Sequence, residues 1–250
     1  MTPVEFGVIT QKIKPYTDYI YLHVMGEPLL HPGFEEMLLI AREAKLNVNI
    51  TTNGSLINSK KAILLNNPIR QINISLHDAE ENIPAEQWNS YLDSIFNFAT
   101  EAAPATYINL RLWNAGVNKS TAFNLFVLDK IARKFDKSFN DISITEKDKG
   151  IKLAPHIFLQ HAARFEWPDG EETRTGTTKT CYALRDQIAV LADGTVVPCC
   201  LDADAHLKLG NIFSSGLSEI LSSERAIKIR NGFINNKITE DFCRSCGFFI

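Results

Sequence analysis

Short apolar stretches alternate with longer stretches of helical periodicity through the first two thirds of the chain. Residues 19–24 are rich in β-branched and aromatic side chains and predict a buried strand, which ends at a Gly-Glu-Pro turn. Apolar side chains at helical spacing then predict an amphipathic helix in residues 34–46, covering a sheet. The same order recurs, with strands predicted at residues 47–52, 70–76 and 106–113 and helices at residues 59–66, 84–102 and 120–135.

A fifth strand is predicted at residues 151–159, broken or bent at Pro155. Strands that alternate with helices favour right-handed βαβ units and one parallel sheet, so the fold class is α/β. The pattern then dissolves into a run rich in Thr and Gly, and residues 164–180 predict a linker.

From residue 181 onward the pattern is of a different kind. Residues 187–192 and 195–198 flank Asp193 and Gly194, the strongest hairpin signal in the chain. A helix is predicted at residues 217–233. We therefore expect a small hairpin and helix module over residues 181–250.

Composition narrows the possible functions. The 250 residues suit one larger domain, or one domain with a small appendage. With 26 basic and 29 acidic residues the net charge is only −3, which argues against a partner such as nucleic acid. No apolar run is long enough for a membrane span, and the first residues lack the features of a signal peptide. We expect a cytoplasmic protein with no membrane partner.

All five cysteines follow residue 180, and in a reducing compartment they are more often metal ligands or reactive thiols than disulfides. Cys181 and Cys199 stand at the two outer ends of the predicted hairpin, so strand pairing can bring them close. Cys243 and Cys246 have the spacing that places two thiolates on one metal. Strand alternation would turn Cys200 to the face opposite Cys199. The pattern predicts a metal centre, and both zinc and a [4Fe–4S] cluster accept four thiolates.

Glu27 follows the first predicted strand. Ligands bind outside the carboxyl ends of parallel strands, so this carboxylate is placed to meet a small molecule, and Gly26 lets the backbone come close. The alternative is that these residues form only a strand-to-helix turn.

These residues resemble a known family. Cys181, Gly194 and Cys199, with the later pair Cys243 and Cys246, resemble the auxiliary-cluster module (SPASM or twitch type) of radical S-adenosylmethionine (radical SAM) enzymes. Residues 25–28 are similar to that superfamily's Gly-Gly-Glu-Pro motif, and residues 51–54, 74–77 and 110–112 are similar to its next strand ends. The resemblance implies a partial (β/α)6 TIM-like barrel, missing its first strand, over residues 1–163, a linker at residues 164–180 and an auxiliary iron–sulfur module over residues 181–250.

The resemblance also implies roles for individual residues. Gly26 and Glu27 would hold the amino group of S-adenosylmethionine, while Ser75 and Arg111 would address its ribose hydroxyls and its carboxylate. Asn53 would shape the same rim, with a plain turn residue as the alternative. The ligands of the auxiliary [4Fe–4S] cluster would be Cys181, Cys199, Cys243 and Cys246. For His23, His31 and His77 we expect structural hydrogen bonds rather than ligand contacts.

The activity implied is that of an oxidoreductase that cleaves S-adenosylmethionine reductively to a 5′-deoxyadenosyl radical, which abstracts hydrogen from a substrate. The auxiliary cluster would accept or relay an electron or contact substrate, a flavodoxin- or ferredoxin-type protein would be the reductant, and the substrate would be a peptide or protein.

One departure from the family is prominent. The Cys-x3-Cys-x2-Cys loop that binds the catalytic cluster is absent, because no cysteine precedes Cys181. We therefore expect that this polypeptide lacks the first strand and the catalytic loop, that the strand at residues 19–24 is a sheet edge, and that the chain as it stands does not cleave the cofactor.

Two other classes of protein remain open. One is a non-catalytic relative that keeps the sheet and one metal centre, and the other is a binding protein with a zinc-ribbon tail. Iron with sulfide at the thiols would exclude the zinc-ribbon protein.

Overall fold

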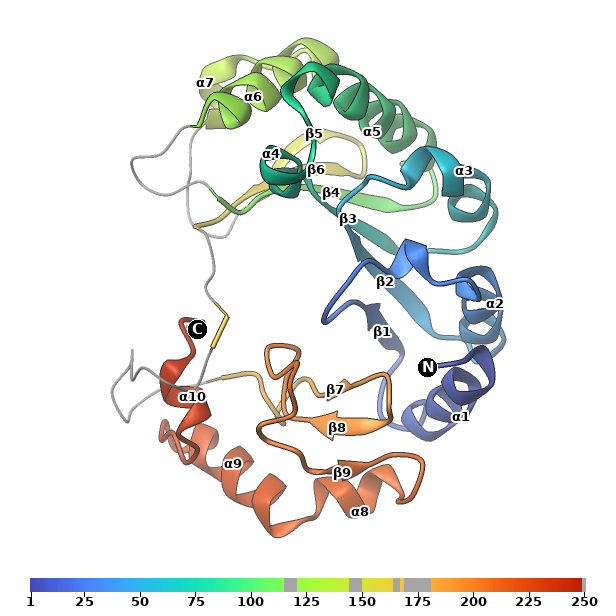
Figure 1. Cartoon of the computed structure of the whole chain (residues 1–250), viewed down its shortest axis with the longest axis vertical. Helices are drawn as coiled ribbons and strands as arrows, with labels where there is room; N and C mark the ends of the chain where they lie inside the picture. The colour runs from blue at the N-terminus through green and yellow to red at the C-terminus, as the bar shows by residue number, and fades with distance from the viewer. Residues whose placement is uncertain (115–120, 144–149, 164–166, 169–180, 249–250) are drawn as a thin grey trace. The chain divides into compact units, whose positions relative to one another are not determined.

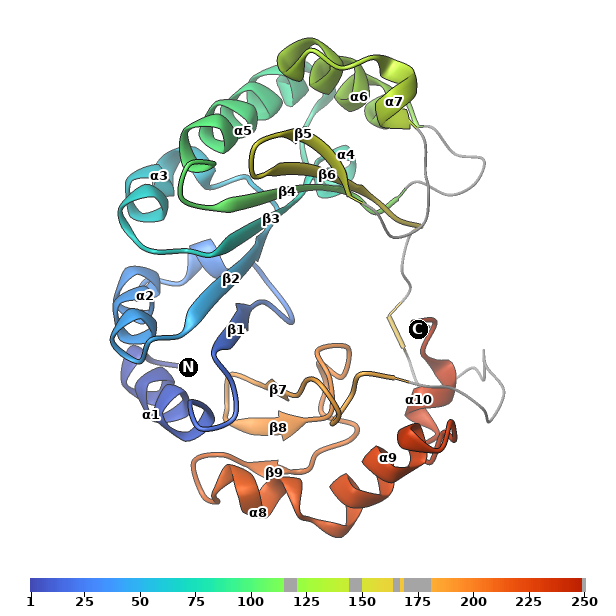
Figure 2. The ribbon, with the colours of Figure 1, turned by 180° about the vertical axis from the view of Figure 1, so that it is seen from behind.

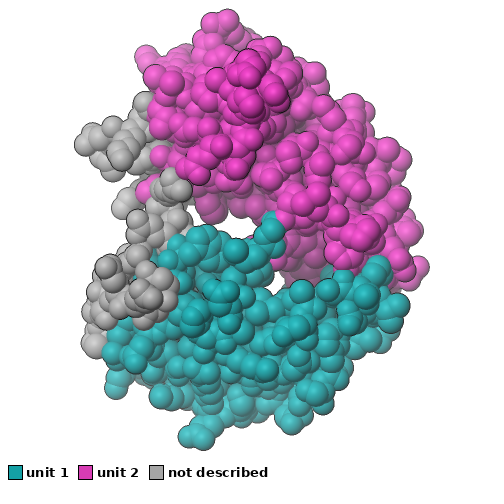
Figure 3. Space-filling model, in the orientation of Figure 1, with its two compact units in different colours: residues 1–17, 24–26, 165–250 teal, residues 18–23, 27–164 magenta. Residues whose placement is uncertain are grey.

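The computed structural model describes the chain except for residues 115–120, 144–149, 164–166, 169–180 and 249–250. Two compact units can be distinguished (Figure 3). The sheet unit comprises residues 18–23 and 27–164, and the thiol unit comprises residues 1–17, 24–26 and 165–250. Most of the predicted linker at residues 164–180 lies outside the described residues.

The sheet unit is built on one six-stranded sheet of order β1-β2-β3-β4-β6-β5 (Figure 1). All neighbouring strands are parallel except β5, which runs antiparallel to β6. This arrangement confirms the α/β class and the parallel sheet, with β1 at one end of the order as predicted. The strands are β1 (Tyr19–Leu22), β2 (Asn47–Thr52), β3 (Gln71–Ser75), β4 (Tyr107–Leu112), β5 (Ile151–Ala154) and β6 (Ile157–His161).

Helices cover one face of this sheet (Figures 1 and 2). That face is entirely apolar at its centre, where Ile50, Ile72 and Leu110 are fully buried. Burying each such side chain contributes about 1.5–3 kcal/mol. The helices are α2 (Phe34–Glu43), α3 (Ile57–Asn66), α4 (Ala79–Asn82), α5 (Trp88–Ala102), α6 (Ala122–Phe135) and α7 (Phe139–Ser143), with 3-10 turns η1 (Pro28–Leu30), η2 (Leu76–Asp78) and η3 (Ala85–Gln87).

The opposite face of the same strands is polar. Strand residues alternate between the two faces, and register partners in parallel strands share a face. We call this second surface the polar face; Phe158 is its one purely apolar member. It consists of Tyr19, Tyr21, Asn47, Asn49, Thr51, Gln71, Asn73, Ser75, Tyr107, Asn109, Arg111, Phe158 and Gln160.

The strand predicted over residues 151–159, broken or bent at Pro155, is broken there and forms two strands instead of one. Pro155 and His156 make the turn between β5 and β6, and His156 adopts the left-handed region with φ +61°. A proline without an N–H group followed by a left-handed residue reverses the chain instead of bending it.

The thiol unit contains a small antiparallel sheet of order β7-β8-β9, formed by β7 (Ala189–Val190), β8 (Thr195–Val197) and β9 (Gly210–Asn211). The predicted hairpin at Asp193 and Gly194 is confirmed. Gly194 has φ +82°, and a Cβ atom there would collide with the Phe213 ring, so the turn requires glycine.

The predicted single helix over residues 217–233 is two helices, α8 (Leu217–Leu221) and α9 (Glu224–Ile234). Ser223 interrupts the run because its Oγ accepts a hydrogen bond from Ala226 N (3.3 Å) and starts a new helix. The last helix is α10 (Phe242–Ser245).

The first helix, α1 (Pro3–Ile13), was not predicted and belongs to the thiol unit. Thr2 and Glu5 form a capping box at its start. Ile9 packs with Val196, Ile212 and Ile220, and Lys12 Nζ donates to the backbone oxygen of Ile212. By its contacts α1 groups with the thiol unit, while the assignment of residues 1–163 to a barrel domain stays a prediction. Among the described helices, none is long and apolar enough to cross a membrane.

Candidate functional site

Free thiols gather in the thiol unit, where all five cysteines are half-buried and none is in a disulfide. Cys199 and Cys200 follow β8, while Cys243 lies in α10 and Cys246 caps its end. Cys181 comes shortly before β7. The ligands thus come from three separate segments.

The thiols affect one another electrostatically. The pKa of Cys199 is raised to about 12, chiefly by burial and in addition by the charges of Cys200, Cys181 and Cys246. Burial likewise raises the pKa of Cys243 well above its usual range, with added repulsion from Cys199, Cys181 and Cys246. The four predicted ligands are therefore close neighbours that disfavour one another's thiolates. A bound cation would reverse this effect, because metal ligation deprotonates a thiol outright.

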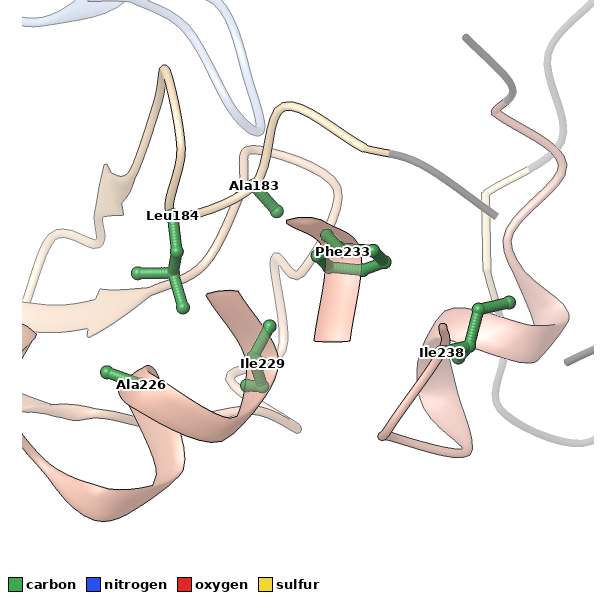
Figure 4. Close-up of a cluster of buried hydrophobic side chains, with 6 residues drawn as sticks. All are labelled: Ala183, Leu184, Ala226, Ile229, Phe233 and Ile238. Carbon is green, nitrogen blue, oxygen red and sulfur yellow. The ribbon is translucent and has the colours of Figure 1, made fainter. Parts of the chain in front are cut away.

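Figure 4 shows a cluster of six buried apolar side chains in the thiol unit. Cys181, Cys199 and Cys243 pack against it. Such an apolar wall lowers the local dielectric and limits water access, two properties that tune an iron–sulfur centre. The cluster is formed by Ala183, Leu184, Ala226, Ile229, Phe233 and Ile238.

Cys200 belongs to the same group of thiols, contrary to the prediction. Burial raises its pKa, and Cys181 and Cys246 raise it further. Strand alternation does not apply here, because β8 ends at Val197 and the chain turns at Cys199 and Cys200. Pro198, which cannot continue a paired strand, is the signal that could have revealed this.

The donor set fits a thiolate-bound cluster in type. As placed, however, the sulfur atoms do not form a ligand set: within the described residues, no three His, Cys, Asp or Glu side chains form a group that could hold a metal ion. The arrangement therefore brings the ligands together without fixing them in coordination geometry.

The sheet unit presents Glu27, Asn53, Ser75 and Arg111 at the carboxyl ends of its parallel strands, whereas Gly26 is grouped with the thiol unit. Glu27 begins η1, and its Oε1 accepts from Leu29 N (3.0 Å). Its Oε2 accepts from Thr52 Oγ1 (2.9 Å) and from Asn53 N (2.8 Å) at the end of β2. Gly26, with φ +83°, has a conformation that other residues rarely adopt. The carboxylate is thus held in one position by three donors.

Asn53 is a turn residue. Its Oδ1 accepts from Ser55 N (2.9 Å) and Ser55 Oγ (2.7 Å), the pattern of an Asx turn. Tyr91 Oη donates to the Asn53 carbonyl (2.6 Å) and fixes the turn to α5. The predicted alternative, that Asn53 is a plain turn residue, is confirmed. A contact between Asn53 and a ligand stays a prediction.

Ser75 and Arg111 are register partners at the ends of β3 and β4. Arg111 is half-buried, its guanidinium lies 4.4 Å from the centre of the Trp113 ring, and its Nε donates to Gln160 Oε1 (3.3 Å). Burial lowers the pKa of Arg111 to about 10. No carboxylate forms an ion pair with Arg111 among the residues that the structure describes. A desolvated cation without an anionic partner is suited to an anionic ligand.

Histidines at this edge have structural partners, as predicted. His77 Nδ1 accepts from Trp113 N (3.3 Å), and His31 Nδ1 accepts from Gly33 N (3.0 Å). Desolvation and then the charge of Arg111 lower the pKa of His23, although its ring remains partly open to solvent. The neutral form of His23 is therefore favoured relative to that of a free imidazole.

Comparison with known proteins agrees with this geometry. Residues 181–247 match the SPASM family of iron–sulfur cluster-binding domains. That match favours iron–sulfur over zinc, a choice that ligand number left open. No curated protein matches the chain.

Several solved structures share the fold at low sequence identity. BtrN in an open conformation has 13% identity and a TM-score of 0.59, covering 99% of this chain and 80% of BtrN. SuiB of Streptococcus suis bound to S-adenosylmethionine has 17% identity and a TM-score of 0.50, covering 99% of this chain and 63% of SuiB. The protein anSMEcpe with bound AdoMet has 15% identity and a TM-score of 0.53, covering 93% of this chain and 75% of that one.

The resemblance inferred from the sequence is thereby confirmed: residues 181–247 match the SPASM iron–sulfur cluster-binding domain, and over nearly all of its length the chain shares the fold of BtrN, SuiB and anSMEcpe.

Proposed function

We propose that the chain binds S-adenosylmethionine at the carboxyl edge of its sheet and an auxiliary [4Fe–4S] cluster at its thiols, as part of a radical SAM/SPASM oxidoreductase. One observation carries the proposal. Glu27 and Arg111, which have opposite charges, lie after parallel strands of a fold that also binds AdoMet in BtrN and anSMEcpe. The methionine part of that cofactor carries both an ammonium and a carboxylate, so each charge has a partner.

Each residue has a distinct role in this proposal. The Glu27 carboxylate, with Gly26 beside it, accepts from the cofactor's ammonium, and the Arg111 guanidinium donates to its carboxylate. Ser75 donates to the ribose hydroxyls, and Asn53 shapes the rim. The hydrogen bonds from Leu29, Thr52 and Asn53 hold the Glu27 carboxylate in place before the ligand arrives.

Cys181, Cys199, Cys243 and Cys246 hold the auxiliary cluster, with the fold of residues 1–163 as a partial (β/α)6 barrel and residues 181–250 as the module. When bound, the cluster accepts or relays single electrons. A flavodoxin- or ferredoxin-type protein supplies them. The apolar wall beside Cys181, Cys199 and Cys243 restricts water at this centre.

The reaction class is hydrogen abstraction by a 5′-deoxyadenosyl radical from a peptide or protein substrate. Support for a peptide comes from SuiB, solved bound to the precursor peptide SuiA, and from anSMEcpe, solved with the Kp18Cys peptide. The alternative is a substrate such as 2-DOIA, with which BtrN was solved together with AdoMet.

The chain of 250 residues contains no cysteine before Cys181 and so no ligands of the Cys-x3-Cys-x2-Cys type. We therefore propose that this polypeptide binds the cofactor without cleaving it, whereas a form with that loop cleaves it.

Calorimetric titration of the anaerobic, cluster-loaded chain with S-adenosylmethionine tests the proposal. We expect saturable binding of one cofactor, and no 5′-deoxyadenosine by chromatography after addition of dithionite. A chain that does not bind the cofactor would disprove the cofactor site. Formation of 5′-deoxyadenosine would disprove the proposed lack of cleavage.

A further inference from the structure

The polar face of the sheet is unusual for parallel strands. Parallel sheets that are covered on both faces have nearly continuous apolar strands, whereas here polar residues occupy every second position. Amide side chains are costly to bury without partners, so a face built from them meets either water or a polar ligand. The described helices of the sheet unit pack on the apolar face (Figures 1 and 2), and on the polar face Tyr19, Tyr21 and Tyr107 are exposed.

A cavity of about 370 Å³ lies on this face, over the amino-terminal halves of β3 and β4. Arg70 and Gln71 lie at the end of the cavity away from Arg111, whereas Gln160, which accepts from Arg111, lies where the cavity adjoins the carboxyl edge. Gln71 and Ser75 mark the two ends of β3, and at about 3.3 Å per residue they are roughly 13 Å apart. The lining of the cavity includes Arg70, Gln71, Tyr107, Asn109, Phe158 and Gln160.

Hydrogen bonds hold the amides of this cavity in fixed orientations. Asn73 Oδ1 accepts from Gln71 Nε2 (2.8 Å) and from Asn109 Nδ2 (2.9 Å). Asn73 Nδ2 in turn donates to the carbonyl of Ile50 (3.1 Å). Asn73 and Asn109 are both buried, so their side chains are locked by the sheet. The cavity wall is therefore organised before any ligand binds.

Two polar atoms of the wall have no protein partner. Gln160 Oε1 accepts from Arg111, but among the described residues neither Gln160 Nε2 nor Asn109 Oδ1 forms a hydrogen bond. One is a donor and the other an acceptor. A peptide group, with one N–H and one carbonyl, complements this pair.

Among the described residues that line the cavity, Arg70 supplies the only formal charge. Its guanidinium lies between the rings of Tyr19 (5.2 Å) and Tyr107 (5.9 Å), and Nη1 donates to Asn49 Oδ1 (3.0 Å). No acidic side chain pairs with Arg70 in the described part of the chain. The stacked guanidinium keeps donors for a carboxylate, which it can bind in a bidentate way.

We propose that this cavity binds an acidic residue of a peptide substrate, with its carboxylate on Arg70 and its backbone amide between Asn109 and Gln160. This inference rests on the peptide substrate class of the proposed function.

Binding of small probes to the full chain at low ionic strength tests this inference. The probes are N-acetyl-glutamate α-amide, its neutral counterpart N-acetyl-glutamine amide, and cationic N-acetyl-lysine amide, followed by ligand-observed NMR. We expect the acidic probe to bind about tenfold more tightly than the neutral one, and the cationic probe to bind most weakly. Equal binding of all three would overturn the inference.

Variants assign the effect to Arg70. Arg70→Gln should abolish the preference for the acidic probe, whereas Arg70→Lys should keep part of it because the charge remains. Arg133→Gln is the matched control, since Arg133 is exposed on α6 and pairs only with Asp129 among the residues that the structure describes. Thermal unfolding of each variant reports whether it is folded. If Arg70→Gln is unfolded, Gln160→Leu replaces it, with about threefold weaker binding expected; unchanged binding in the folded variant overturns the inference.

Two further measurements distinguish a failure of the proposed cavity from a failure of the peptide substrate class or of the cofactor site. Galacturonate offers the same carboxylate on a sugar, and tighter binding of galacturonate than of the acidic peptide probe would overturn the peptide class. S-adenosylmethionine binding should be the same in Arg70→Gln and in the unmodified chain. Loss of cofactor binding in the unmodified chain, with retained preference for the acidic probe, would contradict the cofactor site and leave the cavity supported.

Discussion

The two units prepare their candidate sites in opposite ways. At the sheet edge, the Glu27 carboxylate is held by three hydrogen bonds and Arg111 is stacked on Trp113, so the groups are in place without a ligand. In the thiol unit, Cys199 and Cys243 stand beside other thiols that disfavour their ionisation. Preorganisation by hydrogen bonds suits an organic cofactor, whereas a group of repelling thiolates depends on the metal that neutralises it.

The largest expected effect of this difference is on stability. A bound cluster stabilises only the unit that holds it, by a few kcal/mol when the binding is well above half-saturation. For a unit of this size we expect the thermal transition of the thiol unit to rise by about 10–20 °C on cluster loading. Hydrogen exchange read on separate peptides should show the increased protection in residues 181–247 only, and a matching gain in the sheet would contradict the comparison.

Within the thiol unit, the hairpin turn should affect the free energy of unfolding nearly as much as cluster loading does. Gly194→Ala forces a side chain into a left-handed conformation and against Phe213, which costs about 1–3 kcal/mol. Gly216→Ala is the matched control, because a Cβ there meets nothing within 4 Å and its φ is −72°. Denaturant unfolding of both variants measures the difference. Equal losses of unfolding free energy in the two variants would mean that the turn geometry is not what holds β7 against β8.

At the carboxyl ends of the parallel strands, the Glu27→Gln variant removes the charge of the side chain and keeps its shape. We expect S-adenosylmethionine to bind about tenfold more weakly, because a charge-assisted hydrogen bond is lost. Glu101→Gln is the control, since Glu101 lies on α5 and pairs with Lys61 on α3. Calorimetry of both variants gives the comparison, and unchanged affinity in Glu27→Gln would assign that carboxylate to the turn alone.

The smallest expected effect is a pH dependence of the sheet unit. His161 Nε2 lies 2.9 Å from the Ile142 carbonyl, and burial lowers the pKa of His161 despite this hydrogen bond. A lowered pKa in the folded state means that the unfolded chain binds the proton more readily, so stability is lost as pH falls below about 6.5. We expect the unfolding midpoint to drop by about 2 °C between pH 7.5 and 5.5, and His161→Gln to remove this part of the drop.

Much of the fold could be predicted from the sequence because its patterns are local. Alternation in residues 47–52 and helical spacing in residues 88–102 reflect burial of one face, and the structure has β2 and α5 there. Asp193 and Gly194 define a turn through glycine's conformational freedom alone. All five cysteines of the thiol group could be identified from the sequence, and the spacing of Cys243 and Cys246 indicated a metal site.

What could not be predicted depends on contacts between distant segments. Ile9 and Lys12 of α1 reach partners near residue 212, which no local pattern reveals. The Tyr19, Arg70 and Tyr107 stack joins three strands and likewise has no local signature. Strand alternation did not extend to Cys200 because β8 ends at Val197, one residue before the end of the predicted strand, and the chain then turns.

Iron and acid-labile sulfide analysis of the anaerobically loaded chain, together with its Cys200→Ser and Cys243→Ser variants, tests the central claim most directly. We predict about four iron and four sulfide per chain in the unmodified protein and in Cys200→Ser, with loss of both in Cys243→Ser. Zinc without sulfide, or full cluster content in Cys243→Ser, would contradict the account.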